Sequence, residues 1–516
     1  MVLESTISLE PVDSQEAILA FLGTGSAYGV HEPPVRIDTH AASIFLSGEH
    51  AWKLKRDVRF AYLDFSTPER RHAALQTELQ LNRRTAPELY LAVHPVTRSA
   101  TGRLAIDGVG EAVDWLLEMR RFPDGALLDT MASKAALNPA MLLRLADRIS
   151  EFHAVAEVVA TTAGAARVQS VVDGNTASLA SFPAIFDPAK IRSLHARLTE
   201  MVTRHAALLD TRGGIGRVRH AHGDLHLANI ALIDGEPTLF DCLEFNVELA
   251  TIDVLYDLAF LLTDFWQRGL RTEANIVFNR YLDRSPADED GIALLPLFLA
   301  VRATIRAHVL AAQSARAGSE ASLVNRSLAY FHLANDLLDR VAPRLIAIGG
   351  LSGSGKSTLA RALGGHFGRP PGARVLRSDV LRKQSAGVPL ETPLRVTSYS
   401  LTSSAAVYAS LGRLAAAALT SGQAVVADAV FSKRDERDAI AAVAANASVA
   451  FAGVWLEAPG AVLLDRIASR GPDASDADAQ VADAQANMEI GELGDWRTVS
   501  ASGAVDAVAA AALAVL

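Results

Sequence analysis

One short segment limits the possible folds of this chain more than any other. Residues 350–357 read GLSGSGKS, which matches the pattern G-x-x-x-x-G-K-[ST], and they follow the apolar run 345–348. In such a loop, backbone N–H groups and the N-terminus of the next helix converge on phosphate oxygens. The alternative is a glycine-rich turn between a strand and a helix. The pattern and its context predict a phosphate-binding loop in an α/β domain with a parallel sheet.

The residues of this loop have separate expected roles. Lys356 is expected to reach the terminal phosphates of a nucleotide, and Ser357 is expected to bind Mg²⁺. The glycines allow the backbone to approach the phosphates closely. The residues expected to bind the nucleotide here are Gly350, Ser352, Gly353, Ser354, Gly355, Lys356, Ser357 and Thr358.

Charged residues follow the later strands of this part. Asp379 comes after the next expected strand and Asp428 ends the one after it, where open α/β sheets bind their ligands. We interpret Asp379 as a general base, with a helix-capping carboxylate as the alternative, and Asp428 as a residue on the Mg²⁺ side. Arg466 and Arg470 lie four residues apart on one helix face. They are expected either to close over the transferred phosphoryl group or to form solvated ion pairs.

The composition sets broad limits on the class of protein. At roughly 150 residues per domain, the 516 residues suggest about three compact units. The hydrophobic share of 50% excludes a fibrous or mainly disordered chain. With 49 Lys+Arg against 58 Asp+Glu the net charge is −9, which argues against nucleic-acid binding as the main task. The one cysteine, Cys242, excludes an internal disulfide.

Targeting and membrane signals are weak. The first residues lack the basic region and the apolar run of a signal peptide. The longest apolar runs, 294–301 and 507–516, are shorter than the ~20 residues of a membrane span. We therefore expect a cytoplasmic protein without a membrane-spanning segment, and the oligomeric state stays open.

A second motif lies in the earlier part of the chain. Residues 222–229 read HGDLHLAN between two short expected strands, and Asp241 ends the second of these. A carboxylate, an asparagine five residues later and a second carboxylate after a hairpin are the arrangement that protein-kinase-like enzymes use. Asp224 would accept the proton of the acceptor hydroxyl, while Asn229 and Asp241 would hold Mg²⁺. The alternatives are a polar turn with helix caps, or a zinc site at the two histidines.

From about residue 35 to residue 338 the chain resembles the aminoglycoside phosphotransferase family, whose fold is protein-kinase-like. The family motif H-G-D-x-H-x-x-N is complete at 222–229. The resemblance implies that Lys53 anchors the phosphates of ATP and that Glu78, on the following helix, is its ion-pair partner. Lys55 shares a strand face with Lys53 and is the alternative anchor.

Two further features concern the nucleotide base and the lid of this site. Glu118 and Met119 are expected in the hinge whose backbone groups bind adenine. The glycine run 23–30 is interpreted as an N-terminal loop, because a glycine flap would come directly before the lysine strand. That position belongs to residues 38–43, which we expect to form a glycine-free lid.

Residues 343–516 resemble the P-loop kinases of small molecules and polynucleotide ends. The resemblance is carried by the loop 350–357 and by Asp379, Asp428, Arg466 and Arg470. The whole chain resembles bacterial proteins in which an aminoglycoside phosphotransferase-like domain is fused to a P-loop kinase or AAA-family ATP-binding domain. We therefore predict an α+β protein-kinase-like two-lobed N-terminal part followed by an α/β P-loop kinase domain. The expected domains are a small lobe 1–116, a helical large lobe 117–342 and a P-loop domain 343–516.

These features together predict a bifunctional ATP-dependent phosphotransferase with ATP and Mg²⁺ at two sites and small hydroxylated molecules as acceptors. One alternative is a single phosphotransferase regulated by a C-terminal ATP-binding or ATPase domain. Another is a C-terminal kinase of nucleic-acid ends, which the acidic net charge disfavours.

The sequence leaves the acceptor open. An acidic group after residue 241 favours a cationic acceptor, whereas Arg302 and Arg306, one helical turn apart, favour an anionic group or pair with those carboxylates. We therefore predict only a small metabolite such as a sugar or an amino sugar. The acidic residues are Glu244, Glu248, Asp253 and Asp257.

Overall fold

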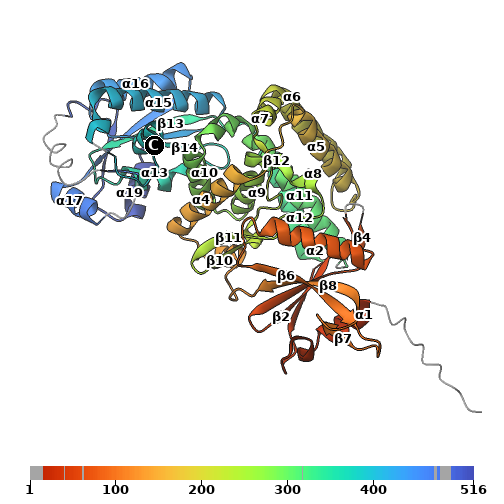
Figure 1. Ribbon diagram of the computed structural model, residues 1–516. Coiled ribbons are helices and arrows are strands. Elements are labelled where there is room, and N and C mark those ends of the chain that lie inside the picture. Colours follow the sequence, from red (N-terminus) through yellow and green to blue (C-terminus); the bar gives the residue numbers. More distant parts are fainter. Residues whose placement is uncertain are drawn as a thin grey trace, which may run out of the picture. The chain divides into compact units, whose positions relative to one another are not determined.

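The protein divides into two compact units, which we describe separately. The computed structural model describes residues 15–39, 41–60, 63–316, 318–394, 396–469, 474–476 and 490–516. The first unit comprises Met1–Leu137, Phe152–Val159 and Arg219–Ile252, and the second comprises Asn138–Glu151, Ala160–Val218 and Asp253–Leu516. Figure 1 labels many of the helices and strands of both units. The domain boundaries near residues 116 and 342 stay predictions.

The first unit is built on a six-stranded antiparallel sheet. The strand order is β1-β2-β3-β8-β6-β7. The β-like runs 35–37, 43–46, 51–55 and 113–119 of the sequence predict four of these strands, β1, β2, β3 and β8, whereas β6 and β7 were not predicted. The bounds are β1 (Val35–Asp38), β2 (Ala42–Ser47), β3 (His50–Lys55), β6 (Tyr90–Arg98), β7 (Leu104–Ile106) and β8 (Glu111–Arg120).

Helices cover both faces of this sheet. Helix α2 (Pro68–Asn82) begins after Thr67, whose side chain accepts a hydrogen bond from the backbone N–H of Arg70, and Pro68 suits its first turn. Leu75 and Leu79 of α2 pack with Leu117 on one face. On the other face, helix α1 (Gln15–Leu22) packs against Phe45, Leu54 and Leu116. Because strand side chains alternate, Leu54 points to α1 and its neighbours Lys53 and Lys55 point to the α2 face.

A tight hairpin follows the HGDLHLAN motif. Strand β9 (Val218–His220) leads into the motif, η2 (Leu227–Asn229) closes it, and β10 (Ile230–Ile233) pairs antiparallel with β11 (Glu236–Leu239). The connecting Asp234 and Gly235 both have positive φ, 52° and 83°, as two-residue hairpin turns require. The hairpin opposes Ile230 to Leu239, which brings Asp241 back towards the motif.

The short remaining elements of this unit join the larger ones. They are η1 (Gly25–Tyr28), β4 (Arg59–Phe60), β5 (Leu63–Asp64), α3 (Leu128–Ser133) and α8 (Val247–Ala250), and β12 (Thr251–Asp253) ends at the limit of the unit. The glycine run 23–30 therefore contains η1 and lies before β1, outside the strand pair that flanks Lys53. Of the expected lid, His40 lies outside the described residues.

The second unit contains the helical region. The sequence predicts helices over 139–153, 188–209, 252–266, 273–282, 291–314 and 323–338, which account for most of the helices found, although α5 was not predicted. The bounds are α4 (Pro139–Val155), of which residues 139–151 belong to this unit, α5 (Gly164–Ala180), α6 (Pro188–Arg204), α7 (Ala206–Gly214), α9 (Val254–Gln267), α10 (Arg271–Arg284), η3 (Pro286–Leu294), α11 (Leu295–Arg316) and α12 (Ala321–Asp336).

One helical stretch of this region is unusually apolar. Pro286–Arg316 spans 31 residues and is, by length and composition, able to cross a membrane. Because 72% of its most apolar window is buried inside the protein, it has the surroundings of a core helix.

A five-stranded parallel sheet forms the rest of the second unit. The strand order is β14-β15-β13-β16-β17, and every pair is parallel. The strands are β13 (Arg344–Gly350), β14 (Arg374–Arg377), β15 (Val425–Asp428), β16 (Ala450–Glu457) and β17 (Arg497–Ser500). The connecting elements are α13 (Lys356–Gly364), α14 (Ser378–Ala386), η4 (Val396–Tyr399), α15 (Leu401–Thr420), α16 (Arg434–Asn446), α17 (Gly460–Ala468) and α19 (Val505–Leu513).

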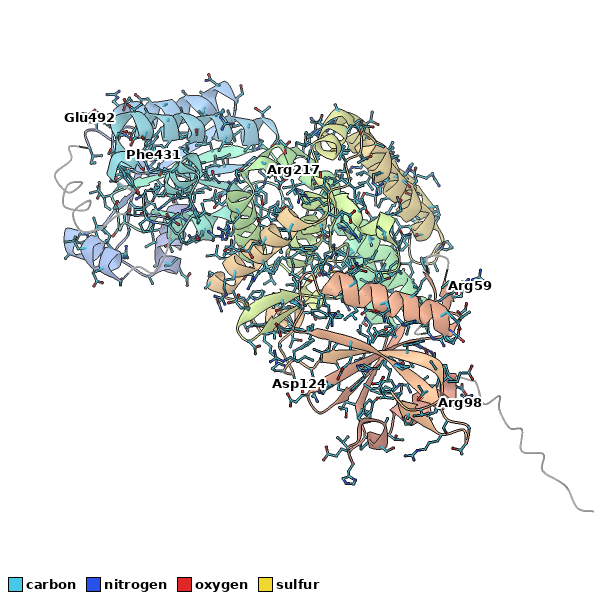
Figure 2. The ribbon with its side chains drawn as sticks, in the orientation of Figure 1. Arg59, Arg98, Asp124, Arg217, Phe431 and Glu492 are labelled. Carbon is cyan, nitrogen blue, oxygen red and sulfur yellow. The ribbon has the colours of Figure 1, made fainter. Side chains whose placement is uncertain are left out.

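Two hydrophobic clusters cover the two faces of the parallel sheet. Val407 and Leu411 of α15 and Ile440 of α16 pack with Phe431 on one face, and Figure 2 shows Phe431 within this part. Leu359 and Leu363 of α13 and Val508 of α19 pack on the other. Both faces of the sheet are thus buried, as expected for parallel strands whose sequences are continuous apolar runs. The predicted fold class, an α+β protein-kinase-like part followed by an α/β P-loop domain, is confirmed.

Buried polar side chains connect α10 to the parallel-sheet region. Asn275 is 1% exposed, and its Nδ2 donates to the carbonyl oxygens of Pro371 at 3.1 Å and Ala373 at 2.8 Å. Arg374 is also 1% exposed and lies 2.9 Å from Asp283 and 2.6 Å from Glu289. Because each of these groups has partners on both sides, the helix and the sheet region form one packed body.

Candidate active sites

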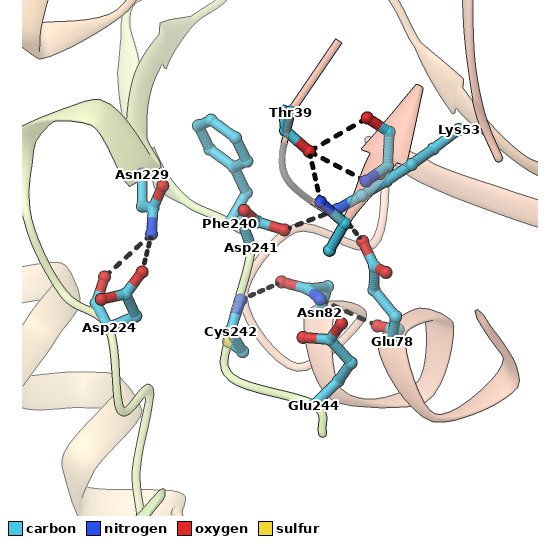
Figure 3. A network of polar contacts seen from close by, with 12 residues as sticks. Thr39, Lys53, Glu78, Asn82, Asp224, Asn229, Phe240, Asp241, Cys242 and Glu244 are labelled. Atoms are coloured by element: carbon cyan, nitrogen blue, oxygen red, sulfur yellow. Dashed lines mark hydrogen bonds and ion pairs between the residues drawn. The ribbon is translucent and has the colours of Figure 1, made fainter. Parts of the chain in front are cut away.

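The residues of the HGDLHLAN region and of the small sheet meet around Lys53. The Lys53 Nζ lies 2.6 Å from Glu78 Oε1 and 2.8 Å from Asp241 Oδ1 (Figure 3). Burial alone would lower the pKa of Lys53, but Asp241 and Glu78 raise it well above its ordinary value. Burial likewise would raise the pKa of Asp241, and Lys53 lowers it below the ordinary value. Both side chains are therefore charged at neutral pH.

Lys55 has a different set of partners. Its Nζ lies 2.6 Å from Glu78 Oε2 and is also paired with Glu244. Burial would lower the pKa of Lys55, and Glu244 and Glu78 raise it. The two lysines thus share Glu78 through its two oxygens, while Lys53 carries the contact to Asp241. Glu244, expected as part of an acidic acceptor pocket, is instead an ion-pair partner of Lys55.

Asp224 and Asn229 also come together. Asn229 Nδ2 donates to the carbonyl oxygen and to Oδ2 of Asp224, both at 2.9 Å (Figure 3). The side chain of Asp224 is 38% exposed, so its carboxylate is accessible to a substrate. Gly223 has φ of 83°, and a Cβ there would lie 3.0 Å from the Leu243 Cβ. The glycine of the motif is therefore required by the backbone.

Two buried residues that the sequence analysis missed hold Asp241 in place. The Asp241 N–H donates to Tyr90 Oη at 3.1 Å, and the next N–H, of Cys242, donates to Asn82 Oδ1 at 2.8 Å. Asp241 itself has φ of 59°, an unusual conformation for a non-glycine residue. Asn82 lies four residues after Glu78 on α2, and this spacing was the one available signal.

The expected adenine hinge lies at the end of β8. Glu118 Oε1 lies 2.8 Å from His50 Nδ1, and its Oε2 lies 2.9 Å from His94 Nε2. Met119 packs against the α2 face of the sheet. The strand pairs with β3 and β6 on its two sides as far as these residues. Adenine binding by Glu118 and Met119 stays a prediction.

The zinc alternative has little structural support. His222 Nε2 donates to the carbonyl oxygen of Phe240 at 2.9 Å, and His226 Nε2 lies 3.4 Å from Asp224 Oδ2. No group of three or more His, Cys, Asp or Glu side chains among the described residues is arranged to hold a metal ion. The oxygen donors of Asn229 and Asp241 instead suit Mg²⁺.

The phosphate-binding loop has the conformation that its glycines require. Gly350, Gly353 and Gly355 have φ of 141°, 81° and 91°. A Cβ on Gly353 would lie 2.5 Å from the carbonyl oxygen of Leu463. Ser354 Oγ is buried and has no hydrogen-bond partner among the residues that the structure describes. A buried hydroxyl in a loop of this shape fits a phosphate oxygen.

The charged residues of the loop and the strand ends also meet. Lys356 Nζ donates to the carbonyl oxygen of Leu351 at 3.0 Å. Ser357 Oγ donates to Asp428 Oδ2 at 2.6 Å, and Arg377 Nε lies 3.4 Å from the same oxygen. The structure therefore brings together the two residues expected on the Mg²⁺ side, Ser357 and Asp428.

Asp379 lies in the first turn of α14, directly after β14. Burial raises the pKa of its carboxyl above the ordinary value, Arg377 opposes this effect, and Asp428 adds to it. The role of Asp379 as a general base stays a prediction.

The remaining expected residues of this site lie on or beside the loop. Arg466 Nη1 would lie 3.7 Å from a Cβ placed on Gly355. Thr358 lines a cavity with Gly353, Gly355 and Arg466. Ser352 is part of the loop itself, and Arg470 lies outside the described residues.

Two buried arginines of the helical region, Arg302 and Arg212, make structural contacts. Arg302 is 4% exposed, lies 3.9 Å from Asp257 and stacks 4.0 Å from the ring centroid of Tyr256. Asp253 pairs with the buried Arg212 at 2.7 Å. Burial lowers the pKa of His308 to about 4. Two of the expected acidic residues, Asp253 and Asp257, therefore balance buried arginines. The contact of Arg302 with Asp257 agrees with the pairing alternative, whereas the partner of Asp253 is Arg212, which was not predicted.

Together these features define a chain that joins a protein-kinase-like part to a P-loop domain. A family model described as an AAA domain matches residues 345–489. Two curated relatives, "Uncharacterized protein Rv2004c" of Mycobacterium tuberculosis (strain ATCC 25618 / H37Rv) and "Uncharacterized protein Mb2027c" of Mycobacterium bovis, are each 30% identical over 487 residues, 92% of this chain and 94% of theirs. The chain belongs to the family of these mycobacterial proteins.

Two solved structures with similarity to the chain are described as a kinase or a kinase family protein. A choline/ethanolamine kinase family protein from Mesorhizobium loti is 12% identical and covers 63% of this chain and 95% of its own, with a TM-score of 0.39. A gluconokinase from Sinorhizobium meliloti 1021 is 23% identical and covers 34% of this chain and 92% of its own, with a TM-score of 0.25.

Proposed function

We propose that the chain is an ATP-dependent phosphotransferase with two nucleotide sites. The kinase-like site consists of Lys53, Glu78, Asp224, Asn229 and Asp241. The P-loop site consists of residues 350–357 with Asp379 and Asp428. The observation that carries the proposal is the ion pairing of Lys53 with both Glu78 and Asp241, in the same unit as the hydrogen-bonded pair Asp224 and Asn229.

At the kinase-like site, Glu78 holds the Lys53 ammonium group, which is then able to donate to phosphate oxygens. Asp224 accepts the proton of the acceptor hydroxyl, and Asn229 fixes the orientation of that carboxylate. Asp241 and Asn229 supply oxygen donors for a divalent cation. Bound Mg²⁺ would neutralise the charge of the phosphates in both sites.

At the P-loop site, backbone N–H groups and the N-terminus of α13 bind the phosphates, and Lys356 donates to their terminal oxygens. Ser357 and Asp428 form the Mg²⁺ side of the site. Asp379 accepts the proton of the second acceptor hydroxyl. Arg466 stands beside the loop, where its guanidinium is able to stabilise the charge on the transferred group.

The acceptors that we propose are small hydroxylated metabolites such as sugars or amino sugars. Support for this class comes from the partly exposed carboxylate of Asp224, which suits a neutral hydroxyl as proton donor. Asp253 and Asp257 are buried and ion-paired with arginines, so neither contributes to the proposed recognition of a cationic group.

The proposal is tested by incubating the full-length protein with Mg²⁺, ATP and a metabolite extract and detecting phosphorylated products by mass spectrometry. Wild type is compared with Asp224→Asn and Lys356→Ala. The matched controls are Asp234→Asn and Lys190→Ala, which change exposed residues of the same charge in the same units. Loss of a different product in each variant supports two transferase sites. Products that neither variant changes would overturn the proposal.

A regulatory role for the P-loop domain is the second candidate. The packing of α10 against the parallel-sheet region favours it, because nucleotide bound at the loop would lie within the same compact unit as these helices. If Lys356→Ala changes only the rate of the Asp224-dependent product, the P-loop domain is a regulator and not a second transferase.

A further inference from the structure

A cavity of about 850 Å³ begins at the P-loop and extends well beyond it. Gly353, Gly355 and Thr358 form the wall where the phosphates of a nucleotide would bind. The base and the ribose are then restricted to the remaining space, and this volume is sufficient for them. The residues that line that space therefore decide how the base is held.

Two of the remaining walls come from distant parts of the sequence, and charged residues such as Arg280, Arg361 and Glu391 complete the lining. One is the C-terminal segment, with Val505 and Val508 of α19. The other is helix α4 of the helical region, which contributes Leu143 and Arg144. Helix α4 thus lines the cavity of a loop that follows it by some two hundred residues.

Ion pairs fix α4 in this position. Asp147, one turn after Leu143, accepts two hydrogen bonds from Arg280 of α10, at 2.6 and 2.7 Å. Arg280 also lies 2.6 Å from Glu391, in the segment after α14. Asn275 ties α10 to the backbone of residues 371–373. The α4 wall is therefore part of the packed second unit.

The chemistry of these walls suits a nucleotide base. Leu143, Val505 and Val508 are apolar and offer a surface for the face of a planar ring. Arginine guanidinium groups stack on such rings and also donate to their polar edges. Arg144 is the arginine that α4 contributes to the cavity.

We propose that α4 forms one side of the base-binding end of the P-loop nucleotide site, with Leu143 against the base and Arg144 over its face. This inference rests on the proposed nucleotide site at the loop and names the residues that complete it. The P-loop domain would then depend on the helical region for its affinity for ATP.

The test compares ATP with inorganic tripolyphosphate, which has the phosphates but no base. Binding is measured by titration calorimetry on the full-length protein. Only the part of the binding that Lys356→Ala removes is assigned to the P-loop site. Arg144→Ala should weaken this binding of ATP about tenfold, and Ala140→Trp, which fills the cavity from an exposed position of α4, should weaken it further. Both variants should keep tripolyphosphate affinity within about twofold of wild type. Arg148→Ala, on the same helix but paired with Glu151, is the control and should change neither.

Photolabelling locates the base directly. Irradiation with 8-azido-ATP should label the tryptic peptide of residues 135–144, and excess tripolyphosphate should remove the label. Unchanged ATP affinity in both variants, or label confined to peptides outside α4, overturns the proposed role of α4. Neither result bears on the nucleotide site at the P-loop itself. Absence of Lys356-dependent binding of both ligands in the wild type overturns the proposed nucleotide site as well.

Discussion

The hydroxyl of Ser357 donates a hydrogen bond to Asp428 Oδ2 across 2.6 Å, which ties the P-loop to the end of a strand 71 residues later. A serine and an aspartate in direct contact here are typical of a site in which the pair holds a hydrated divalent cation. Arg377 approaches the same oxygen of Asp428.

Asp428→Asn should therefore weaken Mg²⁺ binding at the P-loop site. The amide keeps the size of the side chain but removes its charge, and a loss of about 10–100-fold in Lys356-dependent rate at limiting Mg²⁺ is expected. The rate is measured against Mg²⁺ concentration. Asp438→Asn, at an exposed position of α16, is the control. Identical Mg²⁺ curves for Asp428→Asn and wild type would contradict the assignment.

Lys55→Met should destabilise the first unit. Its removal leaves the carboxylates of Glu78 and Glu244 buried without their shared partner. Breaking a buried ion pair from one side costs about 3–5 kcal/mol in the free energy of unfolding. Denaturant unfolding measures this loss, with the exposed Lys134→Met as the control. The double variant Lys55→Met/Glu244→Gln should recover part of the stability, and an unchanged unfolding curve for Lys55→Met would refute the expectation.

The pH dependence of the P-loop site should reflect Asp379. A general base must be deprotonated, so the rate falls as the pH drops through its pKa, and burial places that pKa above the ordinary value. Arg377 lowers the pKa of Asp379, so Arg377→Leu should raise it further and move the acidic limb of the Lys356-dependent rate to higher pH. A limb that stays in place, or moves to lower pH, would exclude Asp379 as the titrating base.

Gly364→Ala should destabilise the second unit because a Cβ there would lie 2.0 Å from Asn275 Oδ1. Overpacking of this kind costs about 1–3 kcal/mol. Gly174→Ala is the matched control, since a Cβ at that helical position meets nothing within 4 Å. The control should stabilise the protein by about 0.5–1 kcal/mol. An equal shift of the thermal unfolding midpoint in both variants would show that Asn275 of α10 leaves room for a Cβ at residue 364.

Local patterns made most of the site predictable. The phosphate loop and the HGDLHLAN segment are short motifs whose chemistry depends on residues close together in sequence, and the contact of Lys53 with Glu78 follows the strand and helix order of the resembled family. Strand β6 was harder to predict because Pro95 interrupts its apolar run. Helix α5 carries glycines at 164 and 174 and has no capping side chain.

Residues that act through tertiary contacts were not predictable. Asn82 and Tyr90 hold the backbone of residues 241–242, and apart from the four-residue spacing between Glu78 and Asn82 nothing in the sequence around them indicates this role. Arg302 was considered a possible ligand for an anion, and burial beside Asp257 explains it instead. Residues of α4 line the cavity through contacts between segments far apart in the chain. Such contacts leave no local pattern in the sequence, so they could not be predicted.

The side chain of Asn275 bears on how readily the P-loop domain can be exchanged between proteins. Its amide fills the space above Gly364 and binds the backbone at Pro371 and Ala373. A domain cut at residue 343 would expose the surface that contacts Asn275. Arg374 would also be exposed and would lose its carboxylate partners, Asp283 and Glu289. The P-loop domain and the helical region therefore share buried polar contacts at this junction, and a P-loop domain transplanted without α10 would lack the partners of these groups.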